Sequence, residues 1–291
     1  MDVLNIQDEF SNKTLKLSEE SFLELKEFVY QQSGILLSDR QKVLLETRLS
    51  GRLKTLGLEN FSDYVKNLKS PEFYHKEKAF LFEAITISES SFFRDANQIR
   101  VLQEIVLPEL FENAIQQQAS QVRILSAGCA AGEEPYTLAM VIKEKFSSYT
   151  SRIPVHIIGV DINSTNLEKA RKGVYHEYSM KNIPQEYLQK YWTRDGYHRV
   201  LNDEIREMVE FKQLNLLHLN KDSSMSRFDL ILCCNVLLYL ERQAKVQVVQ
   251  NLYDALNLPG YLFIGQSESL HGITQAFKLY LFQRAIAYKK E

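Results

Sequence analysis

A small-residue turn followed by two acidic residues has the clearest chemical character in this 291-residue sequence. The apolar run 122–126 leads into Ala127-Gly128-Cys129-Ala130-Ala131-Gly132-Glu133-Glu134-Pro135. Such a turn between a strand and a helix lets the backbone approach a ligand, and in dinucleotide-binding folds it holds a pyrophosphate. Glu133 and Glu134 would repel phosphate. The turn therefore favours a cationic ligand with an amino group and a sulfonium, S-adenosylmethionine, over a nicotinamide cofactor.

Polar residues also follow the later strands of the predicted sheet. Asp161 ends the run 155–161, where an acid can accept both hydroxyls of a ribose. Asn215 follows a strand ending at Phe211, and we expect it to face an adenine amino group. Asn235 ends the run 228–235, and Tyr239 follows it. By themselves Asp161 is equally explained as a helix N-cap and the turn as an unliganded connection. Together they lie at carboxyl ends of strands, where open α/β sheets bind ligands.

The elements that must position these residues alternate between strands and helices. Apolar runs at 122–126, 155–161, 228–235 and 260–265 are separated by helical patterns at 133–146, 164–172 and 241–257. Continuous apolar strands between helices indicate parallel strands buried on both faces, and hence a doubly wound α/β domain. Residues 279–288 predict one or two antiparallel edge strands. Asp195-Gly196 is typical of a hairpin, and we interpret 175–211 as a small inserted β-subdomain.

The chain before this domain has a helical pattern. Ser21 and Glu24 fit a capping box, Gly34 and Gly57 end the first two predicted helices, and Pro71 closes a third. We therefore divide the chain into a helical domain, 1–90, and an α/β domain, 91–291. Five basic residues and one acidic residue lie between Arg40 and Lys54. They indicate either a solvated helix face or a docking surface for an acidic partner.

Composition excludes several classes of protein. The chain is 45% hydrophobic and 25% charged, as in a globular protein, and lacks the ~20-residue apolar stretch of a membrane span. A net charge of −2 does not suggest nucleic-acid binding. The start, MDVLNIQDEF, has no signal-peptide pattern. The three cysteines, Cys129, Cys233 and Cys234, form no CxxC pair. We expect a cytoplasmic protein without disulfides or a metal site.

Several segments give the chain a close resemblance, over nearly its whole length, to the CheR family of chemoreceptor methyltransferases. The phenylalanine–phenylalanine–arginine run and the acidic helix start are far more specific than any glycine turn. The segments that carry the resemblance are Ser91-Phe92-Phe93-Arg94-Asp95, Ser126-Ala127-Gly128-Cys129-Ala130-Ala131-Gly132-Glu133-Glu134-Pro135-Tyr136, Asp161-Ile162-Asn163, Asn215-Leu216-Leu217, Phe228-Asp229-Leu230-Ile231, Asn235-Val236-Leu237-Leu238-Tyr239 and Gly265-Gln266-Ser267-Glu268-Ser269.

The resemblance implies a Rossmann-like S-adenosylmethionine-dependent methyltransferase fold with an inserted β-subdomain and an N-terminal all-helical domain. It implies methyl transfer to glutamate carboxylates on the cytoplasmic signalling helices of chemoreceptors, giving methyl esters and S-adenosylhomocysteine. Arg94 and Tyr239 match the residues that handle the substrate. Alternatively, Arg94 is a salt-bridge residue and Tyr239 a core tyrosine. The expected cofactor-binding residues are Ser88, Ser90, Arg94, Gly128, Glu133, Asp161, Ile162, Asn215, Leu216, Asn235 and Val236.

The chain departs from the family's usual residues at a few positions. The family commonly has arginine where Cys234 stands and histidine where Gln266 stands. The other departures are Ser88 for asparagine, Ser90 for threonine and Ala130-Ala131 for Ser-Thr. A regulator that binds S-adenosylmethionine without transferring its methyl group, or a methyltransferase acting on another protein, are the alternative functions.

The resemblance also bears on partners. We expect Arg48 and Arg52 to dock the acidic receptor helices. Some family members hold a receptor-tail peptide on the inserted subdomain through a longer, glycine-richer loop. The compact hairpin Trp192–Val200, with one glycine, predicts no such tether here. We expect a monomer that binds no nucleic acid and does not insert into membranes.

Overall fold

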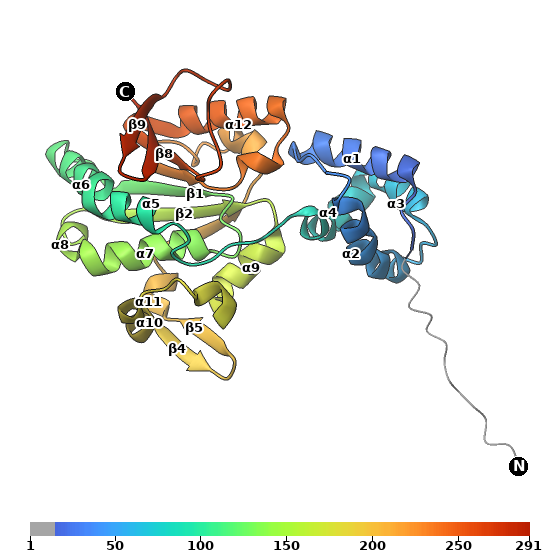
Figure 1. Ribbon diagram of the computed structural model, residues 1–291, viewed down its shortest axis with the longest axis horizontal. Coiled ribbons are helices and arrows are strands. Elements are labelled where there is room, and N and C mark those ends of the chain that lie inside the picture. Colours follow the sequence, from blue (N-terminus) through green and yellow to red (C-terminus); the bar gives the residue numbers. More distant parts are fainter. Residues whose placement is uncertain (1–14) are drawn as a thin grey trace, which may run out of the picture. The chain divides into compact units, whose positions relative to one another are not determined.

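The computed structural model describes residues 15–291, so the N-terminal sequence considered above for a signal peptide lies outside the described residues. The chain divides into two compact units (Figure 1). One contains the described residues up to Val29 together with Leu37–Ile85. The other contains Tyr30–Leu36 and Thr86–Glu291. None of the helices in residues 15–291 has the length and apolar character needed to cross a membrane.

The first unit is helical, as predicted, but two helix boundaries differ from the prediction. Ser18, not Ser21, caps the first helix, because its hydroxyl accepts the Ser21 N–H at 3.1 Å. Pro71 begins a further helix instead of closing the third. Proline suits the first helical position, where its missing N–H would have had no partner. The helices are α1 (Glu19–Ser33), α2 (Gln41–Thr55), α3 (Phe61–Leu68) and α4 (Pro71–Ile85).

A buried ion pair joins α2 to α4 and changes the interpretation of Arg52. Arg52 Nε and a terminal guanidinium nitrogen donate to the two carboxylate oxygens of Glu77 at 2.9 and 2.8 Å. The Glu77 side chain is 1% exposed, and the guanidinium also stacks on Phe80 at 3.6 Å. Arg52, expected on a docking surface, is therefore committed to the interior of the helical unit. Breaking such a pair by removing one partner costs about 3–5 kcal/mol.

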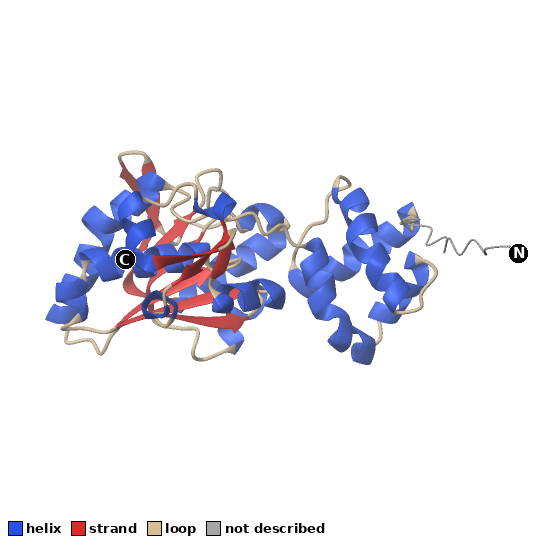
Figure 2. Ribbon diagram, turned by 90° about the horizontal axis from the view of Figure 1, so that it is seen from below, coloured by secondary structure: helices blue, strands red, loops and turns tan. Residues whose placement is uncertain are grey.

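The second unit is built on a large mixed sheet, which confirms the predicted fold class (Figure 2). Five strands are parallel in the order β6-β2-β1-β7-β8, and β10 and β9 follow as antiparallel strands, with β9 at the edge. The strands are β1 (Val122–Ala127), β2 (Val155–Asp161), β6 (Val209–Gln213), β7 (Phe228–Cys233), β8 (Leu256–Ile264), β9 (Lys278–Phe282) and β10 (Ala285–Lys290).

Both faces of this sheet are buried, because successive strand residues enter different hydrophobic cores. Ile124 packs in the core formed with α7, and the next residue, Leu125, packs in the core formed with α12. This explains the continuous apolar runs of the sequence. The helices and turns are α5 (Ala96–Val101), η1 (Leu102–Val106), α6 (Leu107–Gln116), α7 (Glu133–Lys145), α8 (Ser147–Thr150), α9 (Ser164–Lys172), η3 (Leu216–Lys221), η4 (Leu237–Tyr239) and α12 (Arg242–Ala255).

A small antiparallel sheet with strand order β3-β5-β4 interrupts the α/β pattern. The predicted hairpin is confirmed: Asp195 pairs with His198, and Gly196 has a φ of +58°. The predicted insertion, 175–211, extends too far, because Val209–Gln213 pairs with β2 in the large sheet. The elements are β3 (Val174–His176), η2 (Glu177–Met180), α10 (Gln185–Tyr191), β4 (Trp192–Asp195), β5 (His198–Leu201) and α11 (Asp203–Arg206).

Candidate cofactor and active site

The turn between β1 and α7 has the backbone conformation that its small residues predicted. Gly128 and Gly132 have φ values of +78° and +92°, in the region that favours glycine. A Cβ on Gly128 would lie 2.4 Å from Val236 Cγ2, so no larger residue fits there. The Gly128 and Cys129 amides both donate to the Val160 carbonyl, at 2.8 and 2.9 Å. This turn is therefore held against the end of β2 by its own backbone.

Asp161 ties the same two strand ends together. One carboxylate oxygen accepts the Ala130 N–H at 2.9 Å and the other accepts the Asn163 N–H at 2.8 Å. Burial raises the pKa of this carboxyl, and the backbone hydrogen bonds oppose that rise. A carboxylate oxygen accepts more than one hydrogen bond, so a ribose contact remains compatible with this geometry. The sequence did not reveal this second role, in which Asp161 shapes the turn itself.

The surroundings of Glu133 indicate a binding site for a cationic ligand. Its side chain is 5% exposed, and Oε2 is buried without a hydrogen-bond partner in the described structure. Burial raises its pKa from 4.5 to about 7, although hydrogen bonds, including one from Ser90, lower it. An unpaired buried carboxylate is costly and is stabilised by an opposite charge. The residues present thus fit the ammonium group of S-adenosylmethionine, which we expect beside Glu133.

Glu134 faces a different environment from its neighbour. The Ser126 hydroxyl donates to Glu134 Oε1 at 2.6 Å, and the Cys234 thiol lies beside this carboxyl. Burial raises the Glu134 pKa, and the Arg94 charge lowers it by a smaller amount. The two acids of the helix start therefore differ: Glu133 has a free acceptor, and Glu134 is bound to the strand ends beneath the turn.

Arg94 lies within electrostatic reach of Tyr239 and of Glu134. Burial raises the pKa of the Tyr239 hydroxyl and the Arg94 charge opposes that rise, so the hydroxyl remains protonated at neutral pH. The Arg94 side chain is exposed, and its guanidinium donates to the Glu89 carbonyl at 2.9 Å. The preceding aromatic residues anchor this segment, because Phe92 packs edge-on against Tyr175 at 4.8 Å. Arg94 and Tyr239, the two residues expected to handle the substrate, thus lie close enough for the Arg94 charge to act on the Tyr239 hydroxyl.

Two of the remaining predicted cofactor residues, Asn215 and Ser88, form hydrogen bonds to other parts of the chain. The Asn215 side chain accepts the Leu217 N–H at 3.0 Å and donates to the Gln32 carbonyl at 3.0 Å, so it already serves the backbone where we expected an adenine contact. The Ser88 hydroxyl accepts a hydrogen bond from Asn166 at 2.7 Å. The half-buried residues of this group are Gly128, Ser90, Ile162, Leu216, Asn235 and Val236.

Two positions where the chain departs from the family's usual residues are accommodated by local hydrogen bonds. The Cys234 thiol contacts Gln98 Oε1 at 3.4 Å. Gln266 Nε2 donates to Asp95 Oδ2 at 2.8 Å, and the other Asp95 oxygen caps α5 by accepting the Asn97 and Gln98 amides. These contacts hold the start of α5 directly after Arg94.

Sequence reasoning gave no role to one acidic residue beside the site. The Glu268 carboxylate accepts backbone N–H groups from the segments that follow β7 and β8. It belongs to the segment Gly265-Gln266-Ser267-Glu268-Ser269 that contributed to the family resemblance. An acidic residue within four positions of a glycine at a strand end is the feature of the sequence that could have indicated this role.

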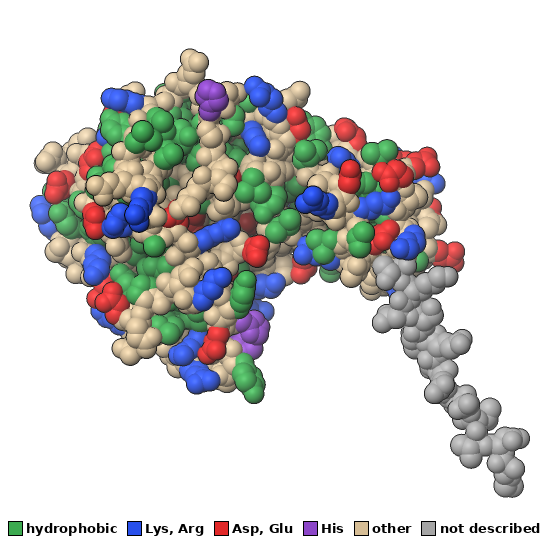
Figure 3. Space-filling view, viewed as in Figure 1, with side chains coloured by type: hydrophobic (Ala, Val, Ile, Leu, Met, Phe, Trp, Pro, Cys, Tyr) green, Lys and Arg blue, Asp and Glu red, His purple; other side chains and the backbone are tan. Residues whose placement is uncertain are grey.

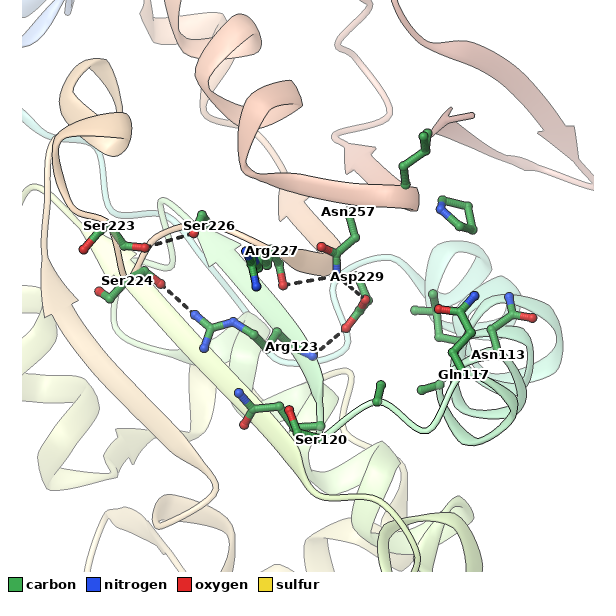
Figure 4. Close-up of a pocket in the computed structure, with 16 residues that line it drawn as sticks. Asn113, Gln117, Ser120, Arg123, Ser223, Ser224, Ser226, Arg227, Asp229 and Asn257 are labelled. Carbon is green, nitrogen blue, oxygen red and sulfur yellow. Dashed lines mark hydrogen bonds between the residues drawn. The ribbon is translucent and has the colours of Figure 1, made fainter.

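A cavity of about 760 Å³ lies at the amino ends of β1 and β7, away from these residues (Figure 4). Its polar groups largely satisfy one another: Asp229 accepts the Arg123 N–H at 2.8 Å and an Asn257 side-chain N–H at 2.6 Å, and the Arg123 guanidinium donates to the Ser224 carbonyl at 2.7 Å. None of the expected site residues lines it.

Comparisons with known proteins match the motifs. The model of the CheR methyltransferase SAM-binding domain matches residues 88–286, and that of the CheR all-alpha domain matches residues 20–86. A chemotaxis protein methyltransferase of Borreliella burgdorferi is 33% identical, over 92% of this chain and 95% of its own length. One from Escherichia coli K12 is 31% identical, over 91% and 90%. Chemotaxis protein methyltransferase 2 of Vibrio cholerae is 29% identical, over 94% of each chain.

Replacing Glu133 with glutamine tests whether its unpaired charge is kept for a ligand. A carboxyl whose folded pKa is about 7, against 4.5 when unfolded, lowers stability as pH rises between these values. Glu133→Gln should therefore raise the melting temperature of the ligand-free chain at pH 8 and change it little at pH 4. The same variant should bind S-adenosylhomocysteine more weakly at pH 8 by calorimetry. A variant that is less stable at pH 8, or that binds as tightly as the wild type, would contradict the assignment.

Proposed function

The chain belongs to the CheR methyltransferase family, and we propose that it transfers the methyl group of S-adenosylmethionine to glutamate side chains of chemoreceptors. The observation that carries this proposal is the match of both family domains, in order, across residues 20–286. The products are glutamate methyl esters and S-adenosylhomocysteine, and the reaction serves sensory adaptation in chemotaxis. The unpaired Glu133 oxygen supports the choice of cofactor.

The reaction requires alignment more than acid–base chemistry. S-adenosylmethionine supplies an electrophilic methyl group on its sulfonium when bound. A substrate glutamate with a pKa of about 4.3 is ionised at neutral pH, so its carboxylate is already the nucleophile. Arg94 can orient that carboxylate through its planar fork of donors, and protonated Tyr239 can donate one hydrogen bond beside it. Glu133 would hold the cofactor's ammonium group, and Asp161, which holds the turn, would also accept from the ribose hydroxyls.

The charge around Arg94 supports its role toward an anionic substrate. Its guanidinium is exposed and bound at one side to the Glu89 carbonyl, which leaves the planar group oriented and accessible. Glu134 and Tyr239 both sense its positive charge. The partner in this hydrogen bond is a neutral backbone carbonyl, so the bond leaves the positive charge available to an anionic substrate.

Replacing Arg94 tests this assignment. Arg94→Ala should retain the fold and S-adenosylhomocysteine binding but lose most methyl transfer to chemoreceptor-bearing membranes, and Arg94→Lys should rescue poorly because it lacks the planar fork. The matched control is Arg100→Ala, an exposed arginine on α5. A fully active Arg94→Ala enzyme would remove Arg94 from the site. A wild-type chain that binds cofactor without transferring methyl groups would instead point to a regulator.

We propose that the exposed face of α2 docks the acidic receptor helices, with different cations from those first expected. Arg52 is bound to Glu77, and Arg48 donates to the Ala84 carbonyl at 2.8 Å although it is exposed. Arg40 and Lys54 are exposed and lie close to four helical turns apart, so they share one face with exposed Val43 and Leu44. On the face drawn in Figure 3, basic and acidic side chains are interspersed over this unit. We therefore expect the receptor to be attracted by this one face of α2 and not by the charge of the whole helical unit.

Charge reversal on this face tests docking. Arg40→Glu with Lys54→Glu should raise the KM for receptor, leave S-adenosylhomocysteine affinity unchanged, and lose its effect as salt rises, because screening at about 0.15 M acts beyond ~8 Å. The control reverses two exposed cations elsewhere, Lys145→Glu with Lys172→Glu. An equal rise of KM in both double variants, or no salt dependence, would return α2 to an ordinary solvated face.

We also propose that the chain recognises the methylation region directly, without a receptor-tail tether. An added peptide strand draws affinity from main-chain hydrogen bonds at a sheet edge. The edge strand β4 spans only Trp192–Asp195 and ends in a compact turn, so few such bonds are available.

Titration with receptor-tail peptides should show no saturable binding. Binding tighter than about 100 μM, ~5.5 kcal/mol, that is abolished by proline at Thr193 or Arg194 would overturn this proposal.

The same proposal places the chain in the cytoplasm as a monomer. It treats residues 1–90 as the docking domain and 91–291 as the methyltransferase domain. The docking charges tested above, Arg40 and Lys54, lie in the first of these domains, and Glu133 and Arg94 lie in the second.

A further inference from the structure

The carboxyl ends of β7 and β8 leave backbone N–H groups without strand partners. The two strands pair in register up to Cys233 and Ile264, and the chain then diverges on either side. Just beyond this pair, the Asn235 and Gly265 amides both donate to Glu268 Oε2, at 2.8 and 2.7 Å. The Leu238 amide donates to the other oxygen at 3.1 Å. One carboxylate thus accepts hydrogen bonds from three backbone amides in place of a neighbouring strand. We call this arrangement, formed by Glu268 and the amides of Asn235, Leu238 and Gly265, the Glu268 clamp.

We propose that Glu268 is a positioning residue for methyl transfer: through the Glu268 clamp it fixes the Asn235–Tyr239 turn, which presents Val236 to the cofactor and Tyr239 to the substrate carboxylate. This inference rests on the proposed function. Glu268 itself contacts neither ligand, and it acts through the backbone of the turn. Tyr239 is only one residue beyond Leu238, whose amide Glu268 holds.

The turn that Glu268 holds has an uncommon backbone conformation. Asn235 has a φ of +61°, in the left-handed region that asparagine adopts more readily than other non-glycine residues. The Asn235 and Gly265 hydrogen bonds to Glu268 are part-buried, so losing their acceptor would destabilise the turn. The clamp therefore stabilises this conformation, and without it the turn would relax toward a conformation that pairs its amides differently.

Close packing transmits the position of the turn to the cofactor site. A Cβ on Gly265 would lie 2.8 Å from both Glu268 Oε2 and Asn235 Nδ2, so glycine is what lets the carboxylate reach the amides. The next residue of the turn, Val236, is so close to Gly128 that a Cβ there would lie 2.4 Å from Val236 Cγ2. A shift of the Asn235–Tyr239 turn would therefore move the side chain that packs on the glycine turn.

Only a carboxylate accepts on both of its oxygens. Glutamine has one acceptor oxygen, and its NH2 group would face an amide N–H that also donates. Glu268→Gln keeps the size of the side chain but loses acceptance at one of the two positions, so either Leu238 or the Asn235–Gly265 pair is left unpaired. The variant thus changes hydrogen bonding with little change in packing.

A carboxylate at the other end of β7 provides a matched control. Asp229 also joins neighbouring strands, because it accepts the Arg123 amide from β1 at 2.8 Å and the Asn257 side-chain amide from β8 at 2.6 Å (Figure 4). It lies at the amino end of the strand, away from the cofactor turn. Asp229→Asn should therefore lower stability in a way comparable to Glu268→Gln without moving the Asn235–Tyr239 turn.

The experiment compares the two variants in the full-length enzyme. Both should melt at a lower temperature than the wild type. At saturating S-adenosylmethionine, Glu268→Gln should lower kcat for receptor methylation by at least about tenfold, since a 1 Å misplacement can cost ~100-fold. Glu268→Gln should also weaken S-adenosylhomocysteine binding through Val236. Asp229→Asn should keep the wild-type kcat and affinity when assayed below its melting temperature.

Several results would overturn the proposal. A Glu268→Gln enzyme with the wild-type kcat would do so, as would an equal loss in Asp229→Asn, which would make the effect one of general stability. If Glu268→Gln fails to fold, Gly265→Ala, which forces the carboxylate away, must lower kcat. Hydrogen exchange of the wild-type chain must show slowed exchange of the Asn235 and Leu238 amides. A wild-type chain that binds S-adenosylhomocysteine but does not methylate receptors would refute the proposed function instead. In that case the S-adenosylhomocysteine affinity of Glu268→Gln, compared with that of the wild type, would still test the clamp.

Discussion

Backbone N–H groups left unpaired where parallel strands end are the constraint around which this site is built. Inside a parallel sheet each amide has a neighbouring strand, but the strands diverge at their carboxyl ends and the amides there must find other acceptors. Two carboxylates provide them. Asp161 joins the turn after β1 to the end of β2, and Glu268 joins the segments after β7 and β8. The positions of Ala130, Asn235 and Gly265 follow from these bonds, and the Val160 carbonyl holds Gly128.

Meeting that requirement with acids concentrates buried negative charge at one end of the sheet. Burial raises the pKa of Glu133, Glu134 and Asp161 together. Glu134 and Asp161 have internal donors, whereas one oxygen of Glu133 has no partner among the described residues. A cationic cofactor would relieve this charge. The chain therefore gives up stability in its ligand-free state and recovers it on binding, a common compromise at functional sites.

The helical unit uses charge in the opposite way. Its most buried acid, Glu77, is fully matched by the two-pronged contact from Arg52 and by the Tyr64 hydroxyl at 3.2 Å. Because this pair lies on the inner side of α2, the cations left for a partner are those on the outer side, such as Arg40 and Lys54. A basic segment in a sequence thus contains residues with unrelated tasks, and only packing separates them.

The sequence by itself determined the fold class, the main strands of the sheet and the helices between them, the glycine turn and the family, because these depend on local patterns: continuous apolar strands, helical spacing and short motifs. It also predicted Glu133, Arg94 and Tyr239 as neighbours of one site, a prediction that the proposed variants test. It did not predict α5, η1 and α6, which precede β1. It did not distinguish Glu133 from Glu134 or Arg48 from Arg52, since adjacent or similarly spaced residues face different surroundings. The second task of Asp161, the backbone contacts of Asn215 and the role of Glu268 depend on bonds between residues 31 to 183 positions apart. Only the tertiary structure brings such residues within hydrogen-bonding distance.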